Sequence, residues 1–86
     1  MPEICRFYGI VIRMFRGDHA PPHFHASYGA DEALLDIRTL GTFAGRLPPR
    51  ALSLVVEWAS QHREELLALW EDAQEHRPMH RLAPLA

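Results

Sequence analysis

The chain contains one cysteine in 86 residues. Cys5 has no partner for an internal disulfide, so no covalent crosslink stabilises the fold. A chain of this length buries only about 60–65% of the surface that it exposes when unfolded. Its stability must then come from close packing, a bound metal or a partner subunit. We therefore expect a homo-oligomer rather than a monomer.

The sequence also lacks long apolar runs. No stretch approaches the roughly 20 apolar residues of a membrane-spanning helix. Residues 1–6 do not have the charged-then-apolar order of a signal peptide. These absences predict a cytoplasmic protein with no membrane partner. Internal repeats and low-complexity tracts are absent as well, so residues 1–86 are expected to form a single domain.

Lysine is absent, and all nine basic residues are arginine. Eleven acidic residues leave a formal net charge of −2. Because phosphate contacts dominate nucleic-acid affinity, this balance argues against a free-standing DNA-binding module, and nucleic acid is not the favoured partner. The 48% apolar content is too high for a disordered chain.

Strand-forming patterns fill the first half of the chain. Residues 4–15 are β-branched and aromatic on both faces, which predicts one long central strand covered on both sides. Residues 16–22 contain a glycine, an aspartate and two prolines, which predict a loop. Further strands are expected at 32–37, with its apolar residues facing the core, and around 42–44.

Strict alternation marks residues 23–28 as another strand. Successive side chains of a strand point to opposite faces. His23, His25 and Ser27 therefore share one face, and Phe24 lies on the other, in the core.

From Pro48 onward the apolar residues repeat every 3.6 positions, which predicts helix. Ser60 is a suitable N-cap residue, so two helices with a break near Ser60 are favoured over one long helix. Residues 51–59 have almost no polar face, so a single sheet cannot cover them. Residues 77–86 contain two prolines and form a tail that is either disordered or laid in extended form on a groove.

These patterns together predict an α+β fold. A three- to four-stranded antiparallel sheet spans residues 3–46, and a C-terminal helical region over 48–76 packs on one of its faces. Antiparallel pairing follows from the short connections, because a parallel crossover needs a dozen or more residues.

Three of the six histidines fall within seven residues. His23 and His25 point the same way from one strand, and the preceding loop can bring back His19 or Asp18. Three neutral nitrogen ligands with an open position would suit a divalent transition metal such as zinc. The sequence therefore predicts a metal site at His19, His23 and His25.

The same cluster also allows metal-free chemistry. Imidazoles titrate near neutral pH, so His23 and His25 could act as general acid and base on a phosphodiester, with Arg13 neutralising the phosphate. In the simpler alternative, Arg13 and Arg6 pair with nearby carboxylates such as Asp36. Both alternatives stay open at this point.

A second group of polar side chains lies in the helical region. His62 and Glu65 share a face with Trp58. They either approach the histidine cluster as further ligands or form a half-buried rim beside Trp58, and the rim is the favoured interpretation.

The chain resembles the small bacterial family catalogued as domain of unknown function 4160. The resemblance extends to about Trp70 and rests on the strings Pro-Pro-His-Phe-His (21–25) and Leu-Pro-Pro-Arg-Ala-Leu (47–52), which occur in the family's order and spacing. It implies no catalytic residues. Genes of this family often lie beside another short family, domain of unknown function 2442, which implies a toxin–antitoxin arrangement.

Two function hypotheses follow. In the first, the protein belongs to a two-gene toxin–antitoxin-like or stress module and binds a small protein encoded by a neighbouring gene. In the second, it is a small histidine-dependent nuclease or a metal-binding protein that uses His19, His23 and His25. The first is favoured, because the net charge argues against a nuclease.

Overall fold

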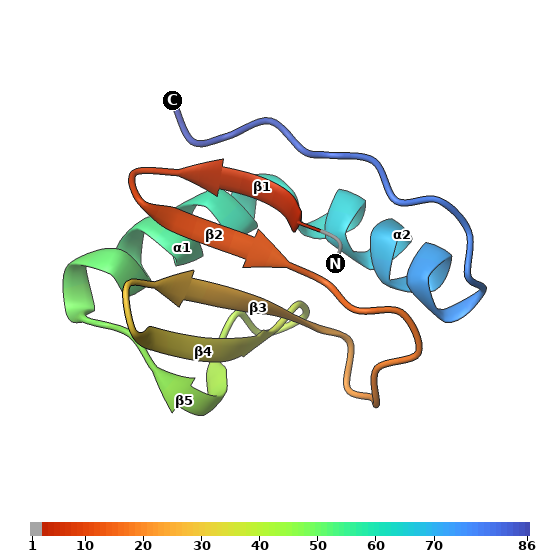
Figure 1. The fold of residues 1–86 in the computed structure, drawn as a ribbon, viewed down its shortest axis with the longest axis horizontal. Coiled ribbons are helices and arrows are strands. Elements are labelled where there is room, and N and C mark those ends of the chain that lie inside the picture. Colours follow the sequence, from red (N-terminus) through yellow and green to blue (C-terminus); the bar gives the residue numbers. More distant parts are fainter. Residues whose placement is uncertain (1–2) are drawn as a thin grey trace.

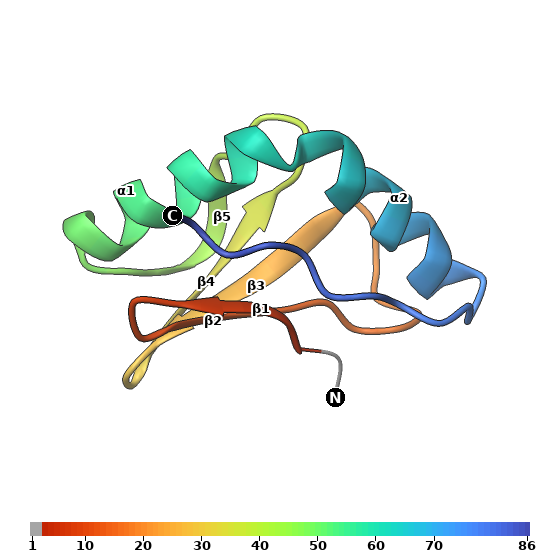
Figure 2. The same ribbon diagram turned by 90° about the horizontal axis from the view of Figure 1, so that it is seen from above.

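The computed structural model describes residues 3–86, in which five strands precede two helices (Figure 1). The strands are β1 (Glu3–Phe7), β2 (Ile10–Arg13), β3 (His23–Tyr28), β4 (Asp31–Asp36) and β5 (Thr42–Arg46), and the helices are α1 (Pro49–Gln61) and α2 (Arg63–Gln74). All four neighbouring pairs are antiparallel, in the order β1-β2-β3-β4-β5. Both helices lie on one face of this sheet (Figure 2). The predicted α+β architecture is confirmed, with five strands instead of three or four.

The extra strand arises because the segment 4–15 is not one long strand. Tyr8 and Gly9 both have positive φ, 50° and 80°, and form a two-residue turn between β1 and β2. Left-handed values at both central positions are typical of a type I′ hairpin turn. The prediction of a single central strand is therefore wrong, and β1 is an edge strand of the sheet.

The pattern of β3 is confirmed in register and in burial. Phe24 pairs with Leu35 of β4, and both are fully buried beneath the helices. Ala26 and Ala33, the next inward pair, are also fully buried. The alternation therefore places His23 and His25 on the face of β3 opposite to Phe24.

The helical region is divided in two, close to the expected position. His62 leaves the helical conformation (φ −127°, ψ 20°), and its carbonyl accepts the first bond of α2 from the N–H of Leu66 at 2.8 Å. Ser60 is not the N-cap, since His62 occupies that place and makes no side-chain cap. The core side of the helices consists of Ala51, Val55, Trp58, Ala59, Leu66, Leu69, Trp70 and Ala73.

After α2 the chain turns back and runs in extended form along β1 (Figure 1). The N–H of Leu82 donates to the carbonyl of Ile4 at 2.8 Å. The indole N–H of Trp58 donates to the carbonyl of Ala83, also at 2.8 Å. Of the two alternatives for residues 77–86, the extended tail on a groove is therefore the one observed.

Among residues 3–86, neither helix has the length and apolar content that crossing a bilayer requires.

Candidate metal centre

The candidate site lies at the start of β3, where the loop 14–22 returns toward the strand. Alternation along β3 puts His23 and His25 on one face, and their ring centroids are 5.3 Å apart. The loop brings Asp18 to the same place. The amide of Gln74 in α2 holds this loop by donating to the main-chain carbonyl of Asp18 at 3.0 Å.

Both imidazoles face a single carboxylate oxygen. Oδ2 of Asp18 lies 3.0 Å from Nε2 of His23 and 3.1 Å from Nε2 of His25. One donor atom from each of the three residues lies within 4.8 Å of the others. Two ligands about 2.0–2.1 Å from one ion are themselves roughly 3–3.5 Å apart, so these distances fit joint coordination of a single cation.

Two of the three side chains, His23 and Asp18, are oriented by a further hydrogen bond. Nδ1 of His23 lies 2.7 Å from the carbonyl oxygen of Pro21, which only accepts hydrogen bonds. Oδ1 of Asp18 accepts the backbone N–H of His19 at 3.0 Å. Nδ1 of His25 lies 3.4 Å from Oε2 of Glu32. That Nδ1 is buried and has no hydrogen-bond partner among the described residues.

One of these contacts determines where a proton lies. The carbonyl of Pro21 only accepts, so Nδ1 of His23 carries the proton of that hydrogen bond. In a neutral His23, the Nε2 lone pair then points at an anionic oxygen of Asp18, 3.0 Å away. Two electron-rich atoms at this distance repel each other unless a metal ion or an additional proton lies between them.

The cluster is largely shielded from solvent. His23, with 4% exposure, is the one buried polar residue in the part of the chain that the structure describes. Aromatic rings surround the imidazoles: Phe15 lies edge-on to His25 at 4.6 Å, and Trp70 lies 5.2 Å from His23. The exposed Phe43 covers His23 from another side at 5.3 Å. These rings exclude water, which strengthens the electrostatic interactions within the cluster.

The carboxyl group of Asp18 is stabilised in its charged form. Its burial raises the pKa, but the hydrogen bond with His25 and the backbone N–H of His19 outweigh that effect, as do the charges of His23 and His25. The net result is a pKa below the ordinary value. An ionised carboxylate is the form that a metal requires.

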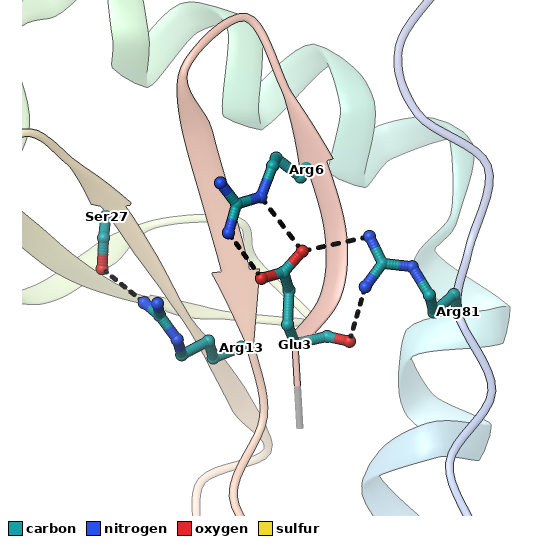
Figure 3. Close-up of polar contacts among 5 residues, drawn as sticks. All are labelled: Glu3, Arg6, Arg13, Ser27 and Arg81. Atoms are coloured by element: carbon teal, nitrogen blue, oxygen red, sulfur yellow. Dashed lines mark hydrogen bonds and ion pairs between the residues drawn. The ribbon is translucent and has the colours of Figure 1, made fainter. Parts of the chain in front are cut away.

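The predicted site residues are only partly brought together. His23 and His25 converge with Asp18, whereas His19 is exposed and contributes its backbone N–H to Asp18. Asp18 thus occupies the position that the sequence analysis assigned to His19. Arg13 lies in register with His25 on the neighbouring strand, and its side chain donates to Oγ of Ser27 at 3.4 Å (Figure 3).

His62 and Glu65 form a separate pair at the junction of the helices. Nδ1 of His62 lies 2.5 Å from Oε1 of Glu65, and the imidazole packs at 5.2 Å from Trp58. Neither residue belongs to the cluster around Asp18. This arrangement agrees with the interpretation of a half-buried rim.

Three hollows in the described part of the chain are lined by neither His23 nor His25. One of about 570 Å³ lies near Tyr8, Tyr28 and Leu54. A second, about 540 Å³, is lined by Trp70 and other residues, but by neither imidazole.

Glu32 is a neighbour of the cluster that the sequence pattern did not indicate. Its signal lies in the pairing of β3 with β4, which sets Glu32 opposite Ser27, diagonally next to His25. Such diagonal neighbours are within reach of long side chains. Without the register, nothing in the sequence distinguishes Glu32 from other acidic residues at a turn.

The fold and the cluster define a small α+β domain with two imidazoles and a carboxylate at the start of the central strand of an antiparallel sheet. The family model described as "Domain of unknown function (DUF4160)" matches residues 9–71. Because this match covers more than half of the chain, the protein belongs to that family. Neither the curated proteins nor the solved structures contain a match.

Proposed function

We propose that this domain binds one divalent transition-metal ion through Asp18, His23 and His25. The observation that carries the proposal is the convergence of two Nε2 atoms on one oxygen of Asp18, at 3.0 and 3.1 Å. The contacts of the two Nδ1 atoms support it, because ligating histidines usually direct their other ring nitrogen at a carbonyl or carboxylate. Here Nδ1 of His23 contacts the carbonyl of Pro21, and Nδ1 of His25 lies 3.4 Å from the carboxylate of Glu32 without a hydrogen bond.

The donor set favours zinc or a neighbouring transition metal. Imidazole nitrogen suits zinc, copper, iron and nickel, whereas magnesium and calcium prefer sites made of oxygen ligands. Two nitrogens and one carboxylate leave at least one position for water. Because the side chains of His23 and His25 are only 5% and 15% exposed, a structural or sensing role of the ion fits the site better than hydrolysis of a nucleic acid.

The test is a titration of the metal-free protein with Zn²⁺, followed by calorimetry. Wild type should bind one ion per chain, and His25→Ala should weaken binding at least about 100-fold because a direct ligand is lost. His19→Ala is the matched control and should bind as wild type does, since His19 contributes only its backbone. Equal loss in both variants, or no stoichiometric binding by wild type, would contradict the proposal.

We also propose a protein-binding role within a two-gene toxin–antitoxin-like or stress module. It is supported by the half-exposed residues Leu52, Leu54 and Val56 on α1, and by the hollow of about 570 Å³ that Leu54 borders. The partner would be the small protein encoded by a neighbouring gene, as the family resemblance implies. A helix with a partly uncovered apolar face is a common recognition element.

Co-expression with the neighbouring gene product tests this role. The two proteins should co-purify in a fixed stoichiometry, and Leu54→Glu should abolish the complex. Ser53→Glu places the same charge on an exposed position of α1 and should leave the complex intact. A complex that survives Leu54→Glu would exclude this face of α1 as the binding surface.

A further inference from the structure

The hollow of about 570 Å³ is bounded by α1, by the turn between β1 and β2 and by the end of the tail. Buried apolar residues, Ile10 and Ala51, are among those that line it. Two of the three large apolar side chains that are exposed within residues 3–86 also line it, Tyr8 at 61% and Tyr28 at 42%. Tyrosine is enriched at protein interfaces, because its ring is apolar while its hydroxyl remains polar. The hollow is therefore suited to a protein partner.

One wall of the hollow is a stripe of three residues on α1, namely Arg50, Leu54 and Glu57. Spacings of four and three residues place them on one face of the helix, in the order cation, apolar, anion. Leu54 is half-buried, and the two charged residues are exposed. Within the described chain, neither Arg50 nor Glu57 forms an ion pair. Both charges are thus available to a partner.

This stripe is complementary to itself when reversed. At a rise of about 1.5 Å per residue, Arg50 and Glu57 are roughly 10 Å apart along the axis of α1, and Leu54 lies close to their midpoint. A second α1 that runs antiparallel about a two-fold axis near Leu54 therefore brings Glu57 of each chain opposite Arg50 of the other. The two Leu54 side chains meet at the axis. A two-fold interface requires this kind of self-complementarity, in which the same surface is used by both chains.

We propose that α1 of a second copy occupies the hollow, giving a two-fold dimer in which each α1 lies in the hollow of the other chain. This inference rests on the proposed protein-binding role of α1, since both require that the face around Leu54 is a recognition surface. It adds the identity of one occupant, because α1 itself carries opposite charges in the order and at the spacing that the stripe matches. The neighbouring gene product would compete with the second copy for the same hollow.

Reversal of one charge at a time tests the proposed pairing. Arg50→Glu leaves two acids on the stripe, and Glu57→Arg leaves two bases. In an antiparallel dimer of either variant, like charges face each other at both ends, so the dissociation constant of the dimer should rise at least about tenfold. An equimolar mixture of the two variants pairs every acid with an arginine. Its dimer should therefore return to within a few-fold of the wild-type affinity.

Sedimentation equilibrium of each chain, without any other protein, provides the measurement. Wild type should form a species with twice the 9.9 kDa mass of one chain. The matched control pair is Arg63→Glu and Glu64→Arg, which makes the same charge changes at exposed positions of α2 that do not line the hollow. These two variants should dimerise as wild type does, both separately and mixed.

Three results would overturn the proposal: a wild type that remains monomeric up to millimolar concentration, a dimer that both single variants leave intact, or a mixture that does not recover. The outcome is distinguishable from that of the proposed protein-binding role. A dimer of this kind without a complex with the neighbouring gene product would uphold the inference and contradict that role. A complex formed by a chain that is monomeric on its own would do the reverse.

Discussion

Nε2 of His25 lies 3.1 Å from Oδ2 of Asp18, although the two residues come from different elements, a strand and the loop before it. His23 shares that oxygen at 3.0 Å. The carbonyl of Pro21 contacts Nδ1 of His23, and the carboxylate of Glu32 in β4 lies 3.4 Å from Nδ1 of His25. Side chains from the loop, from β3 and from β4 therefore lie together around the two imidazoles.

Glu32→Gln should weaken metal binding without abolishing it. The carboxylate of Glu32 lies 3.4 Å from Nδ1 of His25 and favours the proton there. Loss of such an outer contact typically costs about 10–100-fold in metal affinity. A zinc titration measures the effect, and Asp31→Asn, at the exposed start of β4, is the matched control. Unchanged affinity in Glu32→Gln would remove Glu32 from the site.

Phe24→Ala should destabilise the domain by about 3–5 kcal/mol, because Phe24 is fully buried against Trp58. Phe43→Ala removes the same ring from a position that is 48% exposed and should cost about 1 kcal/mol or less. Urea unfolding of both variants provides the comparison. Equal losses would show that the inward face of β3 is assigned incorrectly.

Gly45→Ala should be more damaging than Gly17→Ala. Both glycines have a left-handed φ, 69° and 70°, so both substitutions strain the backbone by about 1–3 kcal/mol. A Cβ at Gly45 would also lie 2.2 Å from the main-chain oxygen of Glu32, whereas nothing lies within 4 Å at Gly17. Thermal unfolding should rank the two variants in that order. A smaller effect at Gly45 would contradict the close approach of β5 to β4.

The ionised carboxylate of Glu3 should stabilise the fold, and this stabilisation should be lost at strongly acidic pH. The hydrogen bond from Arg6 lowers the pKa of Glu3 from 4.5 to about 2, with a further contribution from Arg81, against the opposing effect of burial. A carboxyl group whose pKa is lower in the folded state gives its full stabilisation at pH values above its unfolded-state pKa. That stabilisation is lost as the pH falls toward 2.

The measurement is the difference in unfolding free energy between wild type and Glu3→Gln as a function of pH. This difference should be constant above about pH 5 and should shrink steadily toward pH 2. Glu64→Gln, which removes an exposed carboxylate from the first turn of α2, is the control and should show no comparable decline. A difference that stays constant down to pH 2 would exclude the ion pair with Arg6 and Arg81.

Local pattern was sufficient for much of this fold. The alternation over 23–28 determined that Phe24 is buried and that the two histidines share a face, because the period of a strand is two. The prolines at 48 and 49 and the 3.6-residue repeat located the helices, and the short connections determined the antiparallel sheet. Each of these features depends on residues that are close together in the chain.

Only the tertiary structure decided the turn at Tyr8, the third member of the cluster and the place of the tail. Apolar residues continue through Tyr8 and Gly9, so periodicity alone does not reveal a hairpin there. Asp18 and His19 are adjacent loop residues, and the contact of Gln74 with the loop, distant in sequence, helps to position Asp18. The tail contacts β1 at Glu3 and α1 at Trp58. Such contacts join residues far apart in the chain, and no local pattern encodes which of them will meet.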